Sequence, residues 1–338
     1  MRALAIGVLA IGVLAPSFAR ADTPPSVWDR AKDPTVAESY RLHVEVQRRL
    51  VARERSRFDV EDSQARAARA LLERYGAAKS ADPRLRFDLA LVYLRLKEYD
   101  KAAQLLTSVL AEASEHPAAE MGWKRLAVAC GHTGDRECER RSYGQELRLE
   151  TDESERGTPT LNLAETEMHV GNLREAIEGY REALRIAGRV SSRELAPFAV
   201  WGLAVALDRS GDRLGAEKEA RFARELERSM NVPNLLHTEA AFFTPKYEIH
   251  WYDGLGAAAA ARTSTSPAEI VRLWRSSEQS FASYVRFAEI AKEKDRWLDL
   301  AKLRHAGAKA EREKAEKKYG KEPPRELDEN ERELPRSP

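Results

Sequence analysis

Small and apolar residues recur along this chain in a pattern that repeats four times. The four stretches run from Leu85 to Leu110, Glu120 to Leu147, Pro159 to Leu184 and Phe198 to Ala223. The first half of each stretch contains a Leu-Ala pair, namely Leu89-Ala90, Leu126-Ala127, Leu163-Ala164 and Leu203-Ala204. Seven residues after each Ala comes a turn position, occupied by Lys97, Gly134, Gly171 and Gly211. Glycine suits the end of a helix, where the backbone needs a positive φ. The pattern therefore predicts four pairs of antiparallel helices.

A second small residue follows each turn by five positions. It is Ala102, Ala176 or Ala216 in three of the stretches, whereas the second stretch has Glu139 there. Two helices approach closely only where their side chains are small, so we expect the two small residues of each pair to meet at the helix crossing. One pair cannot bury its apolar face alone, and neighbouring pairs should stack into a superhelix.

Further helices are predicted on both sides of the four stretches. Upstream, residues 35–55 and 60–75 read as two helices without the repeat pattern, which indicates an N-terminal cap. Downstream, Ser266, Pro267 and Glu269 have the spacing of a capping box that opens a long helix. A last helix should extend from Asp295 to about Tyr319. The polar, Pro-rich residues 320–338 are expected to be disordered.

The third stretch resembles the tetratricopeptide repeat family almost throughout. Its sequence NLAETEMHVGNLREAIEGYREAL has the small, aromatic and turn residues of that pattern at Leu163, Ala164, Gly171, Ala176, Tyr180 and Ala183. The resemblance covers about residues 83–228 and departs from the family at Glu139 and in its longer linkers. It implies an all-α fold, a right-handed α-solenoid of antiparallel helix pairs with helical caps. The expected organisation is a signal peptide at 1–21, a cap at 22–80, four repeats at 81–230, a divergent repeat with capping helices at 231–319, and the tail.

The resemblance also implies a binding groove, because in this family the first helix of each repeat lines the concave face. Mapped on this sequence, the groove residues are Phe87, Leu91, Arg95, Lys124, Val128, His132, Leu161, Glu165, His169, Phe198, Trp201, Val205 and Arg209. The alternative is that the C-terminal helices pack into this face. Some family members bind C-terminal carboxylates through a Lys/Asn/Arg clamp, but Val128 stands where the Asn would be needed beside Lys124, so this clamp is not expected.

The N-terminal residues are predicted to be a targeting signal and not part of the fold. Arg2, the apolar run from Ala3 to Ala15 and the Ala-Arg-Ala sequence ending at Ala21 have the features of a secretory signal peptide. We expect cleavage near Ala21 and a periplasmic or secreted mature protein without a transmembrane segment. In an exported protein Cys130 and Cys138 are either a disulfide or two buried thiols, and the sequence leaves both open.

Composition and motifs favour a binding protein over an enzyme. The 56 Lys and Arg residues balance 55 Asp and Glu residues, which gives no support for binding nucleic acid. The sequence contains no H-E-x-x-H, G-x-S-x-G, Gly-rich phosphate loop or C-x-x-C motif, so no catalytic, cofactor or metal site is predicted. The hypothesis is a non-catalytic scaffold that binds a protein or peptide in the envelope, in a secretion, motility or other envelope assembly.

An aromatic cluster at residues 242–256 supports an alternative function. The segment FFTPKYEIHWYDGLG includes Phe242, Phe243, Trp251 and Tyr252 beside His250. The favoured interpretation is the first helix of a fifth, divergent helical pair whose aromatic side chains seal the end of the stack. The alternative is an envelope enzyme or a carbohydrate-binding factor that uses this cluster, which would require these side chains to be exposed.

Overall fold

The computed structural model describes residues 34–51, 58–190, 195–231, 234–238, 241, 243–291 and 294–321. All regular secondary structure in these residues is helical, which confirms the predicted all-α class. The predicted signal peptide, the side chain of Phe242 and most of the predicted tail lie outside the described residues.

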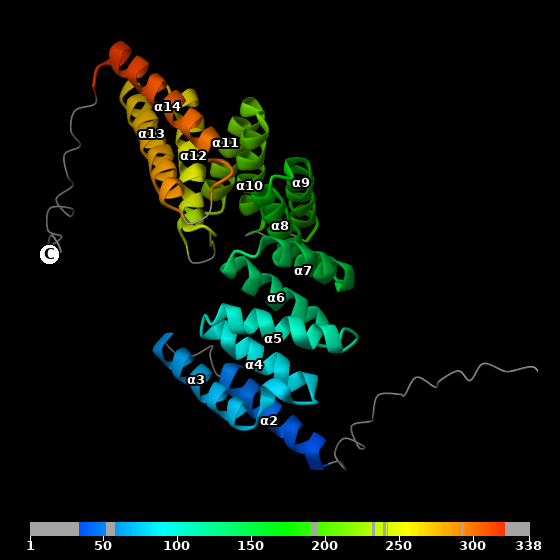
Figure 1. Cartoon of the computed structure of the whole chain (residues 1–338). Coiled ribbons are helices and arrows are strands. Elements are labelled where there is room, and N and C mark those ends of the chain that lie inside the picture. The colour runs from blue at the N-terminus through cyan, green and yellow to red at the C-terminus, as the bar shows by residue number, and fades with distance from the viewer. Residues whose placement is uncertain are drawn as a thin grey trace, which may run out of the picture.

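The helices follow one another in a stack of antiparallel pairs (Figure 1). They are α2 (Pro34–Val51), α3 (Phe58–Arg74), α4 (Pro83–Arg95), α5 (Tyr99–Glu112), α6 (Ala119–Thr133), α7 (Arg136–Leu149), α8 (Glu153–Val170), α9 (Leu173–Val190), α10 (Leu195–Ser210), α11 (Arg213–Ser229), α12 (Ile249–Thr263), α13 (Pro267–Ile290) and α14 (Leu298–Tyr319). Short 3-10 helices are η2 (Ala77–Lys79), η3 (Leu235–His237) and η4 (Lys246–Glu248).

The four predicted turns end the first helix of four consecutive pairs, α4–α5 to α10–α11. Gly134, Gly171 and Gly211 have positive φ angles of 80°, 92° and 96°, and Lys97 adopts a φ of 60° at the corresponding place. Glycine reaches this conformation without the steric cost that a Cβ adds, so the three glycines favour the turn that ends each helix. The turn positions read from the sequence are therefore confirmed.

Small residues allow the helices of the best-formed pair to approach closely. Ala164 of α8 is buried and faces Gly179 of α9, where an added Cβ would lie 2.8 Å from the Ala164 Cβ. In the second pair the small residue lies on the first helix instead, because Glu139 of α7 faces Gly131 of α6. A Cβ on Gly131 would lie 2.8 Å from a Glu139 carboxylate oxygen, so the glycine makes room for the larger residue.

The two cysteines form a disulfide that joins the last turn of α6 to the first turn of α7. Cys130 and Cys138 thus clamp the turn at Gly134, in the pair that departs most from the repeat pattern. Both sulfur-bearing residues are buried among Phe87, Leu106 and their neighbours. The bridge therefore belongs to the core of the second pair.

The C-terminal helices extend the stack. Helices α12 and α13 pack as a fifth pair, and α14 packs on α13. The Ser266 hydroxyl accepts a hydrogen bond from the Glu269 backbone at the start of α13, as the capping box predicted. One continuous apolar core extends from Ala164 to Ala315 and unites α8 to α14, whereas the first helices have separate smaller cores. The largest apolar core of the protein therefore lies in its C-terminal half.

Candidate functional site

Seven of the nine predicted groove residues in the first three repeats retain access to solvent. Side chains of Leu91, Val128 and Leu161 are half-buried apolar groups on α4, α6 and α8. Arg95 is exposed, while Lys124, His132 and Glu165 are half-buried. His132 stacks on Tyr99 of α5 with ring centroids 3.9 Å apart. We call the surface formed by these seven predicted residues, Leu91, Arg95, Lys124, Val128, His132, Leu161 and Glu165, the inner face.

The prediction of an open groove is wrong in the fourth repeat. Val205 is 0% exposed, Trp201 3% and Arg209 5%, and Phe198 is half-buried. The segment from η4 onward and helices α12 to α14 share one core with α10 and cover these side chains. The sequence alternative, in which C-terminal helices fill this part of the groove, is the one that the structure shows.

Two further predicted groove residues are also buried. Phe87 of α4 is 2% exposed and packs against α6, where its ring approaches Gly122. The His169 side chain is 8% exposed and lies beneath η4. Phe87 therefore belongs to the packing between repeats, and His169 to the polar network that covers the fourth repeat.

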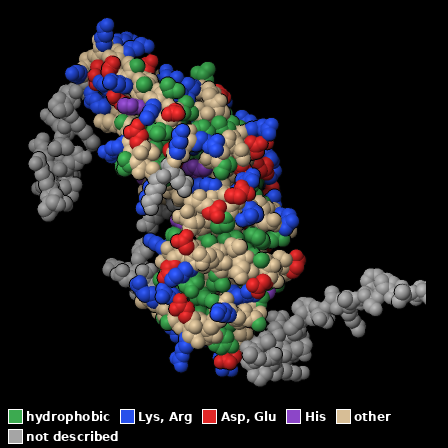
Figure 2. Space-filling view, viewed as in Figure 1, with side chains coloured by type: hydrophobic (Ala, Val, Ile, Leu, Met, Phe, Trp, Pro, Cys, Tyr) green, Lys and Arg blue, Asp and Glu red, His purple; other side chains and the backbone are tan. Residues whose placement is uncertain are grey.

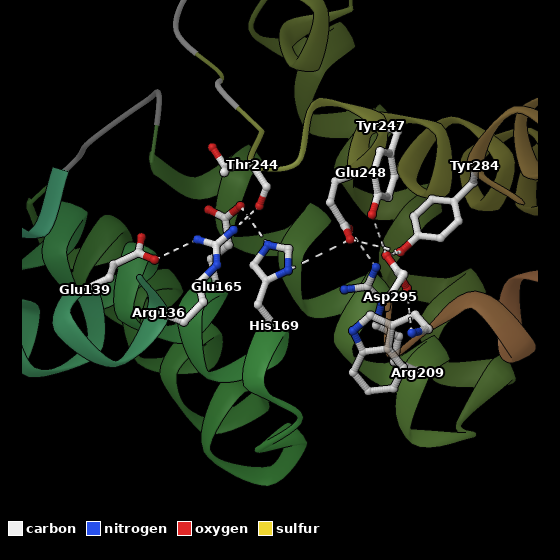
Figure 3. A network of polar contacts seen from close by, with 11 residues as sticks. Arg136, Glu139, Glu165, His169, Arg209, Thr244, Tyr247, Glu248, Tyr284 and Asp295 are labelled. Carbon is white, nitrogen blue, oxygen red and sulfur yellow. Dashed lines mark hydrogen bonds and ion pairs between the residues drawn. The ribbon is translucent and has the colours of Figure 1, made fainter. Parts of the chain in front are cut away.

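The centre of this network is a buried ion pair between α10 and η4 (Figure 3). Arg209 Nη2 donates to Glu248 Oε2 at 2.6 Å, and the two side chains are 0% and 2% exposed. Arg209 Nε and Nη1 have no hydrogen-bond partner. The guanidinium instead lies over the rings of Trp251, at 4.5 Å, and Trp297, at 5.0 Å. These cation–π contacts partly replace the missing hydrogen bonds.

Two tyrosines link the ion pair to the start of the last helix. The Tyr284 hydroxyl of α13 lies 3.0 Å from both Glu248 Oε1 and Asp295 Oδ2. The Tyr247 hydroxyl of η4 donates to the same Asp295 oxygen at 2.9 Å. Asp295 Oδ1 accepts from the backbone of Trp297 at 2.6 Å. Three separate segments are thus joined around Glu248.

Electrostatics favours the charged form of the central pair. Burial acts to raise the pKa of Glu248, but Arg209, together with His169 and the Tyr284 hydroxyl, outweighs burial and holds this pKa below its usual value. For Arg209, burial acts to lower the pKa, and Glu248 together with Tyr284 and Tyr252 more than reverses that effect. Burial and the nearby Glu248 charge raise the pKa of the Tyr284 hydroxyl, so this group stays protonated.

The network continues toward the second repeat through the connector between α11 and α12. His169 Nδ1 lies 3.9 Å from Glu248 Oε1, and its Nε2 lies 3.7 Å from Glu165. The Arg136 guanidinium of α7 donates to the Thr244 carbonyl and to Glu139. Figure 3 shows these groups in one row from α7 to α13. The connector is therefore tied to the repeat that also holds the disulfide.

A second set of contacts fastens α12 and α14 to α10. Asp208 accepts from the Trp251 indole at 3.0 Å and from Arg304 Nε at 2.9 Å. Trp251 is 0% exposed and Tyr252 5% exposed, and His250 stacks on Phe287. This burial removes the exposed aromatic surface that the carbohydrate-binding or enzyme alternative required. Trp251 and Tyr252 are structural, as the favoured interpretation of the cluster predicted.

Sequence reasoning missed an acidic cluster around Lys124. Glu146 of α7 is 4% exposed, and its Oε2 has no hydrogen-bond partner. Burial, together with the nearby Glu120 and Glu150 carboxylates, raises the pKa of Glu146 to about 7 against the opposing charge of Lys124. A hydrogen bond with Glu150, burial and the Glu150 charge raise the pKa of Glu120. Their wide spacing along the sequence gave no local signal for this cluster.

The visible surface carries charges of both signs. Figure 2 shows basic and acidic side chains interspersed over the whole length of the stack, with apolar side chains between them. In the part of the chain that is described, no three His, Cys, Asp or Glu side chains are grouped to hold a metal ion. None of the described helices is both long enough and apolar enough to cross a membrane.

Comparison with known proteins agrees with this architecture. Residues 60–122 match the tetratricopeptide repeat family, and the match begins in α3, which the sequence had assigned to the N-terminal cap. A search among curated proteins finds no match. Among solved structures, the apo form of RapI is 14% identical over 83% of this chain and 99% of its own, with a TM-score of 0.51.

Two other structures are similar over a shorter part of the chain. A putative kinesin light chain of Podosopora anserina with nearly identical TPR-like repeats is 20% identical over 57% of this chain and 97% of its own, with a TM-score of 0.46. BtubC (BKLC) from P. vanneervenii is 20% identical over 58% and 90%, with a TM-score of 0.45. Residues 60–122 match the tetratricopeptide repeat family, and the chain has the α-solenoid fold that tetratricopeptide repeats form.

Proposed function

We propose that this protein is a non-catalytic scaffold that binds a protein or peptide partner on the inner face of α4, α6 and α8. The tetratricopeptide-repeat fold supports a role in protein–protein interaction. The observation that carries the proposal is the contrast between the two halves of the groove. The chain covers the fourth repeat with its own helices, while seven of the nine corresponding side chains of the first three repeats stay accessible.

The chemistry of the inner face favours an amphipathic peptide segment. Leu91, Val128 and Leu161 offer apolar contacts on the first helices of three successive repeats. Arg95 and Glu165 add charges of opposite sign. A helix or an extended segment with one apolar side and flanking charges of both signs would match this arrangement, because apolar anchors supply affinity and charge pairing fixes the orientation.

The proposed location is the bacterial periplasm, in an envelope, secretion or motility assembly. The signal-peptide pattern before Ala21 and the disulfide between Cys130 and Cys138 both support it, since disulfides persist in oxidising compartments. Cell fractionation tests this location. The full chain should lose residues 1–21 and appear in the periplasmic fraction, whereas a chain without these residues should stay in the cytoplasm. Full-length protein in the cytoplasm would contradict the proposal.

Site-specific photo-crosslinking tests the binding face. A photoreactive amino acid at Val128 or Leu91 should capture a partner in living cells. The matched control is the same residue at Leu214 of α11, an apolar side chain that is 82% exposed and lies away from the inner face. We expect a defined adduct at Val128 and none at Leu214. Adducts at Leu214 alone would move the contact to another surface.

A charge substitution then tests whether the crosslinked partner binds on the inner face. Leu161→Glu places a charge among the apolar side chains, and it should abolish the Val128 adduct if the partner buries this surface. Its control is Leu214→Glu, which introduces the same charge elsewhere. Leu161 also packs against two apolar clusters of the core, so a helical circular dichroism spectrum of the variant is required before the adducts are compared. An unchanged Val128 adduct in a folded Leu161→Glu protein would contradict the proposal.

A further inference from the structure

A cavity lies on the side of the solenoid formed by α10, α11, η3 and α12. Its volume is about 230 Å³. It is lined by Trp201, Arg224, Glu227, Arg228, Asn234, Leu236, His237, Tyr252 and Asp253. None of these residues except Trp201 belongs to the predicted groove, and Trp201 is buried away from the inner face. The cavity is therefore separate from the proposed partner surface.

Arg224 contributes a buried hydrogen-bond donor without an acceptor among the described residues. Its Nε is buried and makes no hydrogen bond. The two carboxylates nearby are already engaged, because Glu227 accepts from the Trp201 indole at 2.9 Å and Asp253 lies 2.9 Å from His237 Nε2. A buried N–H without an acceptor costs free energy, so an acceptor that enters the cavity would be stabilised beside Arg224 Nε.

The helix packed opposite leaves space for this guanidinium. A Cβ at Gly256 of α12 would lie 2.9 Å from Arg224 Nη2 and 2.8 Å from the Trp201 ring. Only a residue without a side chain fits there without moving both groups. The backbone of α12 thus confines the Arg224 guanidinium beside the cavity.

Two arginines and two carboxylates line the cavity, and both carboxylates are already hydrogen-bonded, whereas Arg224 keeps an unused donor. Burial lowers the pKa of Arg224, and the charges of Glu227 and Asp253 only partly offset it. An anion bound at Arg224 Nε would act on this pKa in the same direction as the two carboxylates. Arg228, which is exposed at the edge of the cavity, adds a second positive charge.

The remaining walls are suited to an apolar group. Trp201, Leu236 and Tyr252 line the cavity and are 3%, 7% and 5% exposed. The volume is below the range of about 300–1,000 Å³ that is usual for larger ligands, so the occupant must be small. An amino-acid-sized molecule with one acidic group and an apolar body fits both features.

We propose that this cavity binds a small organic carboxylate, with its carboxylate on Arg224 and its apolar body against Trp201, Leu236 and Tyr252. Arg224 supplies a charge-assisted hydrogen bond from Nε or a bidentate pair from its planar guanidinium. Asn234 and His237 lie at the same cavity and offer further polar contacts. The site is independent of the partner proposed for the inner face, and the carboxylate binds without a chemical reaction.

Calorimetric titration with 3-phenylpropanoate tests the site on the mature full-length protein. The probe combines a carboxylate with an apolar ring, and its neutral amide, 3-phenylpropanamide, is the matched ligand control. We expect binding of the carboxylate at about 1 mM or tighter. Binding of the amide should be about tenfold or more weaker, as the loss of a charge-assisted hydrogen bond predicts. Acetate, which lacks the apolar body, should also bind at least tenfold more weakly.

Two variants of α11 assign the binding to Arg224. Arg224→Gln should weaken 3-phenylpropanoate about tenfold or more. Arg221→Gln changes the same residue type one turn earlier, outside the cavity, and should leave the affinity unchanged. Without ligand, Arg224→Gln should melt at or above the wild-type temperature, because the change removes a buried donor that has no acceptor.

Several outcomes would overturn this proposal. Wild-type protein that does not bind the carboxylate, or that binds carboxylate and amide equally, has no carboxylate site. Equal affinity in Arg224→Gln would place the anion elsewhere. A melting temperature of ligand-free Arg224→Gln well below wild type would show that Arg224 serves the fold. Equal affinity for acetate would remove the apolar part of the assignment.

Discussion

Replacing Glu248 with Gln removes one charge from the centre of the buried network at nearly constant volume. Arg209, whose side chain is fully buried, would lose the carboxylate that lies 2.6 Å away. The Gln amide oxygen can still accept from the Tyr284 hydroxyl. The substitution therefore tests the charge pair itself and leaves the shape of the site nearly unchanged.

The expected cost is large because the guanidinium stays in place. Removing one partner of a buried ion pair typically destabilises by about 3–5 kcal/mol, since the other charge is left uncompensated. The contacts of Arg209 with the rings of Trp251 and Trp297 remain, so we expect the lower end, about 3 kcal/mol. Each 1.4 kcal/mol is a factor of ten in an equilibrium constant, so local opening should become about a hundredfold more frequent.

Hydrogen exchange followed by mass spectrometry locates this effect. A solenoid unfolds in parts, so global melting alone would average the change over the chain. In Glu248→Gln, amide protection in α12 to α14 should fall about a hundredfold, while α4 and α5 keep theirs. Glu175→Gln is the matched control, because Glu175 forms an exposed pair with Arg174 and such pairs contribute little.

Two results would refute this reasoning. Unchanged protection of α12 to α14 would show that the ion pair does not hold these helices over α10. An equal loss of protection in α4 and α5 would show that the effect is not local. As a further check, replacing both Arg209 and Glu248 by Met should restore much of the lost protection, because no charge is then left buried alone.

Three other predictions concern packing and pH. Ala164→Leu should lower the free energy of unfolding by about 1–3 kcal/mol, because it adds methylenes where α8 meets Gly179; an unchanged thermal melt would contradict the helix register. Trp201→Ala should cost about 3–5 kcal/mol as a buried large-to-small change, measured by urea unfolding, and a cost near zero would show that the fourth repeat is open. Glu146 has a folded pKa raised from 4.5 to about 7, so wild-type stability should fall by up to about 3 kcal/mol as pH rises through this window. Glu146→Gln should remove that part of the pH dependence, and equal slopes in the two proteins would contradict it.

Local signals were enough to predict the helical pairs. The Leu-Ala pairs and the turns at Lys97, Gly134, Gly171 and Gly211 depend on backbone conformations and close approaches that neighbouring residues determine. The capping box at Ser266 is of the same kind, because its hydrogen bond spans only three residues. Element positions therefore followed from the sequence to within a few residues.

The exception in the second repeat required knowledge of the facing helix. Glu139 broke the small-residue pattern, and the sequence alone left its consequence open. The structure shows that Gly131 on the other helix of the pair takes over the role of the small residue. Both residues are visible in the sequence, but their pairing depends on the crossing point of α6 and α7, which a helical pattern does not specify.

The sequence also did not predict that the C-terminal helices cover the fourth repeat, and the reason is a different one. Arg209 and Glu248 are 39 residues apart, and Asp208 and Arg304 are 96 apart. Such pairs depend on the path of the connector after α11, for which no repeat pattern exists. The sequence did contain one signal for this closure. Arg209 lies in the last turn of the largely apolar helix that begins at Leu195, and a charged residue that is buried needs a partner of opposite charge.

The contacts from Arg136 to Thr244 and from Arg209 to Glu248 have a mechanical consequence. In a simple solenoid each repeat touches only its neighbours, so the stack can stretch and change its curvature like a spring. Here the connector braces α7, α8 and α10 from the inside. The curvature from α7 onward is therefore fixed, and any adjustment to the shape of a partner must come from the pair α4–α5 and the helices before it.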